Sequence, residues 1–110
     1  MATFKNAELD LTTTATDAYT CPASTTAIIM AMQVTNVNTT TDAVVTVQWL
    51  DSSNTDKVTR LAASYLLEAK LAFSPVVQGK LVLEAGDKIQ ALADAIDLAE
   101  MTVSVLELPA

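Results

Sequence analysis

Residues 43–56 read AVVTVQWLDSSNTD and join an alternating apolar segment to a polar, turn-forming tail. In an extended chain Val45, Val47 and Trp49 point to one side, and the polar residues between them point to the other. This alternation predicts a strand with one buried face and one wetter face. Trp49 is the only tryptophan of the chain and its largest candidate anchor for a core.

Similar alternation recurs before and after this segment, separated by clusters of turn-forming residues. We expect strands at residues 8–14, 18–21, 26–37, 43–50, 57–67, 80–84, 88–93 and 100–108. Residues 26–50 are expected to form one antiparallel pair. The tight turn Ala85-Gly86-Asp87 is expected to join residues 80–93 into another.

The segment 26–37 (TAIIMAMQVTNV) carries Ile28, Met30, Met32 and Val34 at strict period two. This spacing predicts a long strand that buries all four side chains on one face. Methionine is flexible and suits irregular contacts, so the pair of methionines fits either a core or a contact surface.

The segment after residue 67 leaves two interpretations open. We expect an irregular connection up to Ser74-Pro75, but apolar residues at helical spacing make a short helix within 61–73 the alternative.

The chain has only two glycines, Gly79 and Gly86. Each is expected to adopt a backbone angle that other residues adopt only at a cost.

The pattern as a whole predicts the all-β class. About eight short strands with little helical signal indicate an antiparallel β-sandwich of the jelly-roll or immunoglobulin-like kind. A chain of 110 residues is long enough for one core, so we expect a single domain over residues 8–110. Residues 1–7 show no periodicity and are expected to form an N-terminal arm.

Composition excludes several classes of function. The net charge is −7 with only six lysines and arginines, scattered singly, which argues against nucleic-acid binding. No apolar run approaches the roughly 20 residues that span a bilayer, and no secretory signal is recognisable. We therefore expect no membrane partner and a soluble protein that stays in the cell or leaves it without the secretory route. Cys21 is the only cysteine and forms no intrachain disulfide.

Candidate catalytic and metal-binding groups are few. The chain has no histidine, which excludes imidazole-dependent triads, and its two isolated glycines make no phosphate loop. Cys21 lacks a partner base and is expected to be an inert, half-buried thiol. Asp94, Asp97 and Glu100 lie close in sequence and could approach a calcium ion through their oxygens. The turn 51–56 partly resembles a calcium-binding loop but lacks the central glycine and the bidentate glutamate. We therefore expect no catalytic residues, no cofactor and no metal.

Three blocks of sequence carry a resemblance to a known class. The segments AVVTVQWLDSSNTDKVTRLA (43–62), SPVVQGKLVLEAGDKIQALAD (74–94) and MTVSVLEL (101–108) are similar to short virion structural proteins of tailed bacteriophages. The similarity extends from about residue 9 to residue 108 and lies in a pattern of β segments. The stretch 61–73 departs from it, because it is richer in leucine and alanine than a polar loop.

The resemblance implies a small all-β protein of the phage virion. The expected role is that of a head decoration or cement protein, a homo-oligomer and specifically a trimer, that stabilises the capsid by binding the major capsid protein across capsomer boundaries. The alternatives are a tail or fibre module for host attachment, and a free carbohydrate-binding or adhesion domain. Apolar residues beyond the needs of one small core are the interface candidates: Phe4, Met30, Met32, Leu66, Leu67, Leu71 and Phe73.

Overall fold

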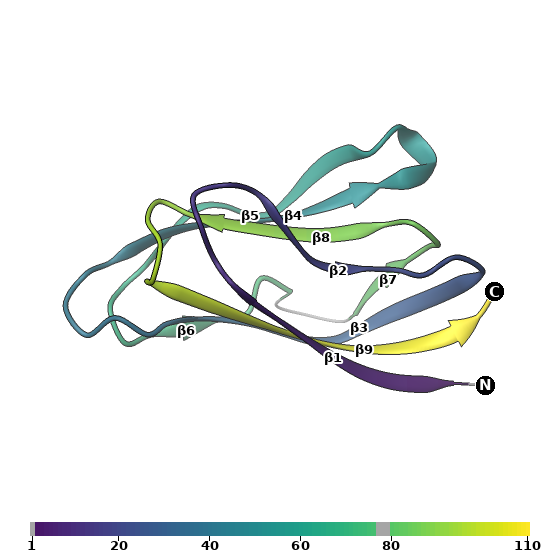
Figure 1. Ribbon diagram of the computed structural model, residues 1–110, viewed down its shortest axis with the longest axis horizontal. Coiled ribbons are helices and arrows are strands. Elements are labelled where there is room, and N and C mark those ends of the chain that lie inside the picture. The colour runs from purple at the N-terminus through teal and green to yellow at the C-terminus, as the bar shows by residue number, and fades with distance from the viewer. Residues whose placement is uncertain (1, 77–79) are drawn as a thin grey trace.

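The protein is an antiparallel β-sandwich, shown here as a computed structural model that describes residues 2–76 and 80–110. Two sheets pack face to face, and both termini lie at the same end (Figure 1). Sheet A contains β1 (Thr3–Asp10), β9 (Ala99–Pro109), β3 (Thr25–Asn36) and β6 (Ala72–Phe73) in that order, with β7 (Leu81–Leu83) also paired to β3. Sheet B contains β2 (Thr16–Thr20), β8 (Lys88–Ala93), β4 (Ala43–Asp51) and β5 (Lys57–Leu67). The predicted all-β sandwich is confirmed, with nine strands and no α-helix in the described part of the chain.

The central strands pack as the alternation predicts. In β4, Val45 and Val47 are fully buried and Trp49 packs against the edge of the core. In β9, Met101, Val103 and Val105 are buried in the same core, while the residues between them face outward. The core therefore consists mainly of the inward side chains of β3 and β9 from sheet A and of β4 and β8 from sheet B.

The interior of β3 differs from the prediction. A register shift between Ile29 and Ala31 inserts Met30 as a bulge in the pairing with β9. Because a bulge reverses the alternation, Ala27 and Ile29 point inward before it, and Met32 and Val34 point inward after it. The expectation that Ile28 and Met30 are buried is therefore wrong: Ile28 is half-buried, and Met30 is 41% exposed.

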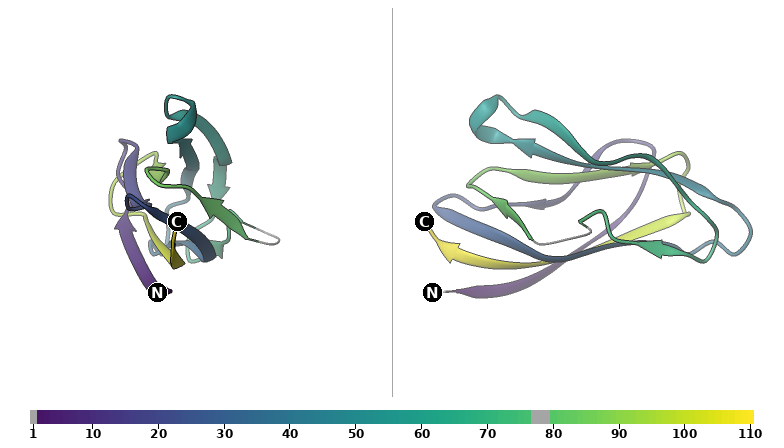
Figure 2. Two further views of the ribbon diagram at one scale, coloured as in Figure 1. Left: turned by 90° about the vertical axis from the view of Figure 1, so that its right-hand side faces the viewer. Right: turned by 180° about the vertical axis from the view of Figure 1, so that it is seen from behind.

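Two expected hairpins are also wrong. Residues 26–50 do not form a pair, because β3 lies in sheet A and β4 in sheet B, and the connection at 37–42 crosses between the sheets. Likewise β7 pairs with β3, whereas β8 pairs with β2 and β4. Consecutive strands in this fold thus often lie in opposite sheets, and β4–β5 is the adjacent-strand hairpin that remains. Its tip, η1 (Ser52–Asn54), lies at the same end of the sandwich as the two termini (Figure 2).

The first strand begins earlier than expected. β1 covers residues 3–10 rather than 8–14, and it pairs with β9 from Thr3↔Glu107 to Asp10↔Glu100. From Thr3 onward, the segment expected as an arm is the first half of this edge strand. It carries little sequence signal because an edge strand can expose both of its faces, and residues 3–6 are all exposed.

The connection after β5 contains no helix. β5 ends at Leu67, as expected, and a turn leads to the two-residue β6. Tyr65 of β5 stacks on Phe73 of β6 with ring centroids 4.1 Å apart, which closes the gap between the two sheets on this side. The alternative of a short helix within 61–73 is therefore wrong.

The Ala85-Gly86-Asp87 turn connects β7 of sheet A to β8 of sheet B. Gly86 has φ +87°, and a Cβ at this position would lie 3.0 Å from Ser52 Oγ, which confirms the expected backbone role. The other glycine, Gly79, lies outside the described residues. Among the described residues no helix is long and apolar enough to cross a membrane.

Candidate functional site

Among the described residues, Asp87 accepts the most side-chain hydrogen bonds, and its side chain is almost fully buried. Its Oδ1 accepts hydrogen bonds from the backbone N and the Oγ of Ser52, both at 2.9 Å. Its Oδ2 accepts from the backbone N of Glu84 at 2.9 Å and from Trp49 Nε1 at 3.4 Å. Burial alone would raise the pKa of Asp87, but these hydrogen bonds outweigh it and hold the pKa below its usual value. The carboxylate thereby joins the β7–β8 turn to the tip of the β4–β5 hairpin.

Asp87 also belongs to the one group of carboxylates in the described residues that is close enough to hold a metal ion. Oxygens of Asp51, Glu84 and Asp87 lie within 4.8 Å of one another. Both Asp87 oxygens already accept two hydrogen bonds each, and Asp51 Oδ1 accepts from the N and Oγ of Ser53. These hydrogen bonds hold the β7–β8 turn and the tip of the β4–β5 hairpin in place.

In the other oxygen-rich stretch, residues 94–100, the Asp94 side chain accepts a hydrogen bond from the backbone N of Val44.

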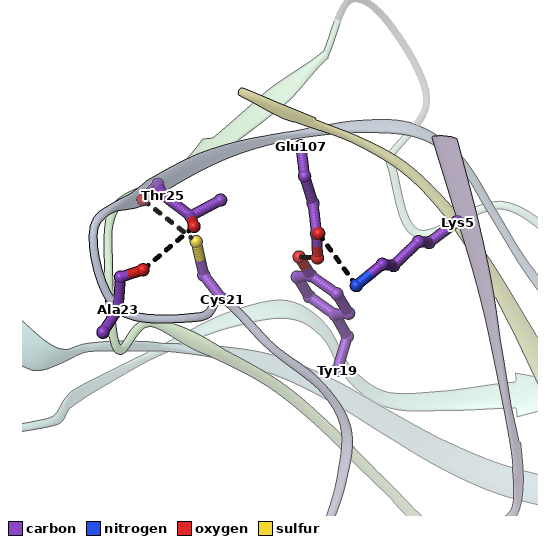
Figure 3. A network of polar contacts seen from close by, with 6 residues as sticks. All are labelled: Lys5, Tyr19, Cys21, Ala23, Thr25 and Glu107. Carbon is purple, nitrogen blue, oxygen red and sulfur yellow. Dashed lines mark hydrogen bonds and ion pairs between the residues drawn. The ribbon is translucent and has the colours of Figure 1, made fainter. Parts of the chain in front are cut away.

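A second polar network joins β1, β2 and β9 at the edge of the sandwich (Figure 3). Tyr19 donates its hydroxyl hydrogen to Glu107 Oε2 at 2.5 Å, and Lys5 Nζ lies 3.0 Å from Glu107 Oε1. Burial, followed by the hydrogen bond to Glu107, raises the pKa of Tyr19, and the hydrogen bond from Tyr19 lowers the pKa of Glu107. The network therefore keeps Glu107 ionised. It joins the first half of β1 to β9 in the same sheet and to β2 in sheet B.

Cys21 lies close to this network and is more deeply buried than expected, with 1% of its surface exposed. Its thiol donates to the backbone O of Thr25 at 3.3 Å (Figure 3). It also lies 3.7 Å from the backbone O of Leu83. Burial raises the pKa of this thiol, which keeps it protonated and unreactive.

The seven interface candidates fall into two groups. Phe4, Leu66 and Leu71 are more than half exposed, Met30 is 41% exposed, and Phe73 is half-buried beneath Tyr65. Met32 and Leu67 belong to the buried core, each with 2% of its surface exposed. The five accessible candidates are themselves divided between two places: Phe4 and Met30 lie on sheet A, and the other three lie on β5, on β6 or, for Leu71, in the turn between these strands.

The strand register brings Phe4 into an apolar row that crosses sheet A. Phe4 of β1 pairs with Leu106 of β9, Leu106 pairs with Ile28 of β3, and Ile28 pairs with Val82 of β7. Leu106, Ile28 and Val82 point away from the core, because their neighbours along each strand point into it, and Phe4 lies directly opposite Leu106 on the same face. Phe4 is 74% exposed and Val82 52%. We call this set the apolar row.

Sequence reasoning missed Leu106, Ile28 and Val82 as surface residues. One signal was present, because the alternation in residues 100–108 places Leu106 on the same side as Thr102 and Ser104. The row itself depends on which strands are neighbours, and the sequence does not show this.

Along the same outer face the character changes from apolar to acidic. Beyond the apolar row come the paired residues Asn6 and Ser104, whose side chains are hydrogen-bonded at 2.7 Å. Next comes Glu8, and at the far end Asp10 stands directly opposite Glu100. We call Glu8, Asp10 and Glu100 the acidic rows. Neither of the two ion pairs seen among the described residues involves any of the three.

Two shallow hollows accompany the acidic rows. One of about 310 Å³ is lined by Asn6, Ala7, Glu8, Thr102 and Ser104. The other, of about 210 Å³, is lined by Asp10, Val37, Asp97, Ala99 and Glu100. Each hollow therefore has at least one carboxylate in its wall.

The outer face of sheet B has a different character. Gln48 Nε2 donates to Gln90 Oε1 at 3.0 Å, and Gln90 Nε2 donates to Asp17 Oδ1 at 2.7 Å. Lys88 Nζ lies 3.9 Å from Asp17. Polar side chains thus bond to one another across three strands of this face, and Gln48 is only 7% exposed.

Comparison with known proteins gives structural matches only. The sequence matches no protein-family model and no curated protein. The structure is similar to a chain of the capsid of Helicobacter pylori bacteriophage KHP30, with a TM-score of 0.58, 14% identity, and coverage of 99% of this chain and 89% of the other. It is equally similar to a protein of Bacillus endospore appendages, described as disulfide-linked pili, with a TM-score of 0.58, 11% identity, and coverage of 99% and 87%.

A third match is a part of a chain from the T13 viral particle of IBDV. Its TM-score is 0.56 and its identity 7%, and the alignment covers 96% of this chain but 30% of the other. The likeness is one of fold. At these identities the three matches show that the chain has a β-sandwich that also occurs in viral particles and in a pilus.

Proposed function

We propose that this chain is a structural protein of a bacteriophage particle and that it acts without catalysis. Its specific role in this proposal is that of a head decoration or cement protein, which binds the major capsid protein across capsomer boundaries. The mechanism is mechanical, because apolar surface buried across a boundary adds roughly 25 cal/mol per Å² to the free energy needed to separate the subunits.

The observation that carries the proposal is the match to the KHP30 capsid chain. The alignment covers 99% of this chain and 89% of that one, so the two sandwiches correspond from end to end and are of similar length. In the IBDV match the same fold is only a part of a much longer chain. A capsid component that consists of little more than this sandwich is therefore a close precedent in size as well as in fold.

We further propose that the chain acts as a homo-oligomer, specifically a trimer. Leu66 of β5 and Leu71, just before β6, are exposed, and Tyr65 of β5 stacks on Phe73 of β6. This side offers an open strand edge next to apolar side chains, a combination that favours contact between copies. Met32 and Leu67 are buried in the core and are not part of the proposed contact.

In this proposal residues 8–110 are the single folded domain. The remaining described N-terminal residues lengthen β1 along the edge of sheet A, where the Phe4 side chain is 74% exposed. Assembly in the host cytoplasm and a final location in the virion complete the proposal.

The proposal is tested on purified particles of the phage that encodes the chain. Gel densitometry should find the protein in a copy number comparable with that of the major capsid protein. Particles from a deletion strain should lose resistance to heat and to osmotic shock, and the purified protein should restore it.

A few copies per particle, together with loss of adsorption in the deletion strain, would instead support the tail or fibre role. Absence of the chain from purified particles would contradict both roles.

A further inference from the structure

We propose that the outer face of sheet A is the surface that docks on the capsid shell. The inference rests on the proposed function and names the chemistry of the partner: a protein surface with an apolar strip and, about 20 Å away, lysine or arginine side chains. The spacing follows from the six residues that separate Phe4 from Asp10 along β1, at about 3.3 Å per residue.

The apolar row provides the central contact. It runs across four neighbouring strands, so its side chains form one continuous strip and not isolated exposed residues. Met30, pushed outward by the bulge in β3, and Leu108, two residues beyond Leu106 on the same face of β9, extend this strip. Exposed apolar patches that cross several elements commonly mark protein–protein contacts.

The acidic rows define the charge of the partner. Asp10 and Glu100 stand directly opposite each other in the β1–β9 register, and Glu8 lies on the same face two residues from Asp10. Like charges in directly opposed positions destabilise a sheet, so this placement costs folding energy in the free protein. Lysine or arginine side chains of a partner would remove this repulsion on binding and would orient the partner along the strands.

The two hollows give room for such side chains. The larger one has Glu8 in its wall and the smaller one has Asp10, Asp97 and Glu100. Both lie on the acidic side of the apolar row. A long basic side chain entering either hollow would therefore meet a carboxylate.

Two other assignments fit the residues less well. A second copy of this chain would bring another set of acidic rows and no matching cluster of cations, since the whole chain has six lysines and arginines. On the outer face of sheet B the Asp17, Gln90 and Gln48 side chains already bond to one another. The outer face of sheet A thus exposes both the apolar row and the acidic rows. A partner with an apolar strip and basic side chains would contact both.

The test uses capsid shells from a deletion strain of the phage and the purified full chain. The apolar variant is Phe4→Asp, which is expected to fold because Phe4 is 74% exposed. The acidic variant is Glu8→Gln/Asp10→Asn/Glu100→Gln. The control is Thr20→Asp, which places the same new charge on an exposed position of β2 in sheet B.

Binding to shells is measured by co-sedimentation at low and at high salt. We expect Phe4→Asp to weaken binding by about tenfold or more at both salt concentrations, since the most exposed side chain of the apolar row is lost. The acidic variant should bind more weakly at low salt and should lose most of the salt dependence. Thr20→Asp should bind like the unmodified chain.

The possible failures are distinguishable. If the unmodified chain does not bind the shells, the proposed function fails and the inference fails with it. If the unmodified chain binds and Phe4→Asp binds equally well, the inference alone is overturned. It is also overturned if sedimentation velocity shows that Phe4→Asp dissociates an oligomer of the free protein, because a second copy then occupies this face.

Discussion

At the scale of single residues, buried polar groups in this sandwich fix turns and edges. Asp87 shows this most clearly, because one carboxylate accepts four hydrogen bonds from three other residues. Its sequence context predicted a tight turn but not this role. The partners Ser52 and Trp49 lie on a separate hairpin, 35 and 38 positions away in the chain, and only the packing of the two sheets brings them together.

The substitution Asp87→Asn is expected to reduce the free energy of unfolding by about 1–3 kcal/mol at neutral pH. The amide would turn one NH₂ group toward backbone and side-chain donors that need an acceptor. Urea denaturation followed by tryptophan fluorescence measures the change. The control Asp56→Asn, at an exposed position in the hairpin turn, should stay within about 0.5 kcal/mol of the unmodified protein.

The pH dependence of this difference follows from the lowered pKa of Asp87. A carboxyl whose pKa is lower in the folded state stabilises the fold fully above its unfolded pKa of about 3.9, and this stabilisation is lost as the pH falls through the folded value. The stability gap between the unmodified protein and Asp87→Asn should therefore be constant near neutrality and should narrow below about pH 4. A gap that is equally wide at pH 3 and pH 7 would contradict this account.

At the scale of elements, the bulge in β3 makes the observed strand differ from the one predicted from the sequence. Period two in IIMAM treats Met30 and Met32 as equivalent, and no propensity difference separates them. The bulge places Met32 in the core, 2% exposed, and leaves Met30 41% exposed. A one-residue insertion into a ladder depends on the partner strand β9, and a single sequence does not show that pairing.

The two methionines therefore make a matched pair of substitutions within one strand. Met32→Ala should lower the free energy of unfolding by about 2–5 kcal/mol, because it removes a buried side chain and leaves a cavity. Met30→Ala should change it by no more than about 0.5 kcal/mol. Urea titrations of both variants under the same conditions give the comparison. Equal losses would show that β3 runs without a bulge and buries both residues.

The sequence also does not predict which strands pair with one another. Alternation located most strands to within a few residues, including 57–67 and 88–93, because one face of each strand packs on the core. It did not show that the chain crosses between sheets after β3 and after β7. The turn after β7 looks like a hairpin turn in sequence, and the difference lies in the partners that β7 finds on β3.

At the scale of the whole molecule, the outer faces of the two sheets differ in the side chains they carry. On sheet B the outward side chains of Asp17, Gln90 and Gln48 bond to one another, whereas sheet A presents the apolar row and the acidic rows. From the sequence, Phe4 and Met30 were identified as surface candidates, but the row was not, since its members are far apart in the chain. Their alignment depends on the register of four strands, β1, β9, β3 and β7, no two of which are consecutive in sequence.

The reactivity of Cys21 tests how firmly the two sheets are packed together. This residue follows β2 of sheet B, yet its thiol contacts the backbone of Thr25 in β3 and Leu83 in β7, both of sheet A. Reaching the sulfur with a reagent therefore requires the sheets to separate. Because the pKa of the buried thiol is also raised, the folded protein should react with a disulfide reagent such as DTNB far more slowly than the urea-unfolded chain.

We expect the labelling rate to increase with urea with the same dependence as global unfolding, because no smaller opening exposes the sulfur. The matched control is Thr20→Cys/Cys21→Ala, which moves the thiol by one residue to an exposed position and should label rapidly in the folded state. Rapid, urea-independent labelling of Cys21 itself would show that β2 detaches locally. The sandwich would then open at this edge first, and the Tyr19–Glu107–Lys5 network would be too weak to hold it closed.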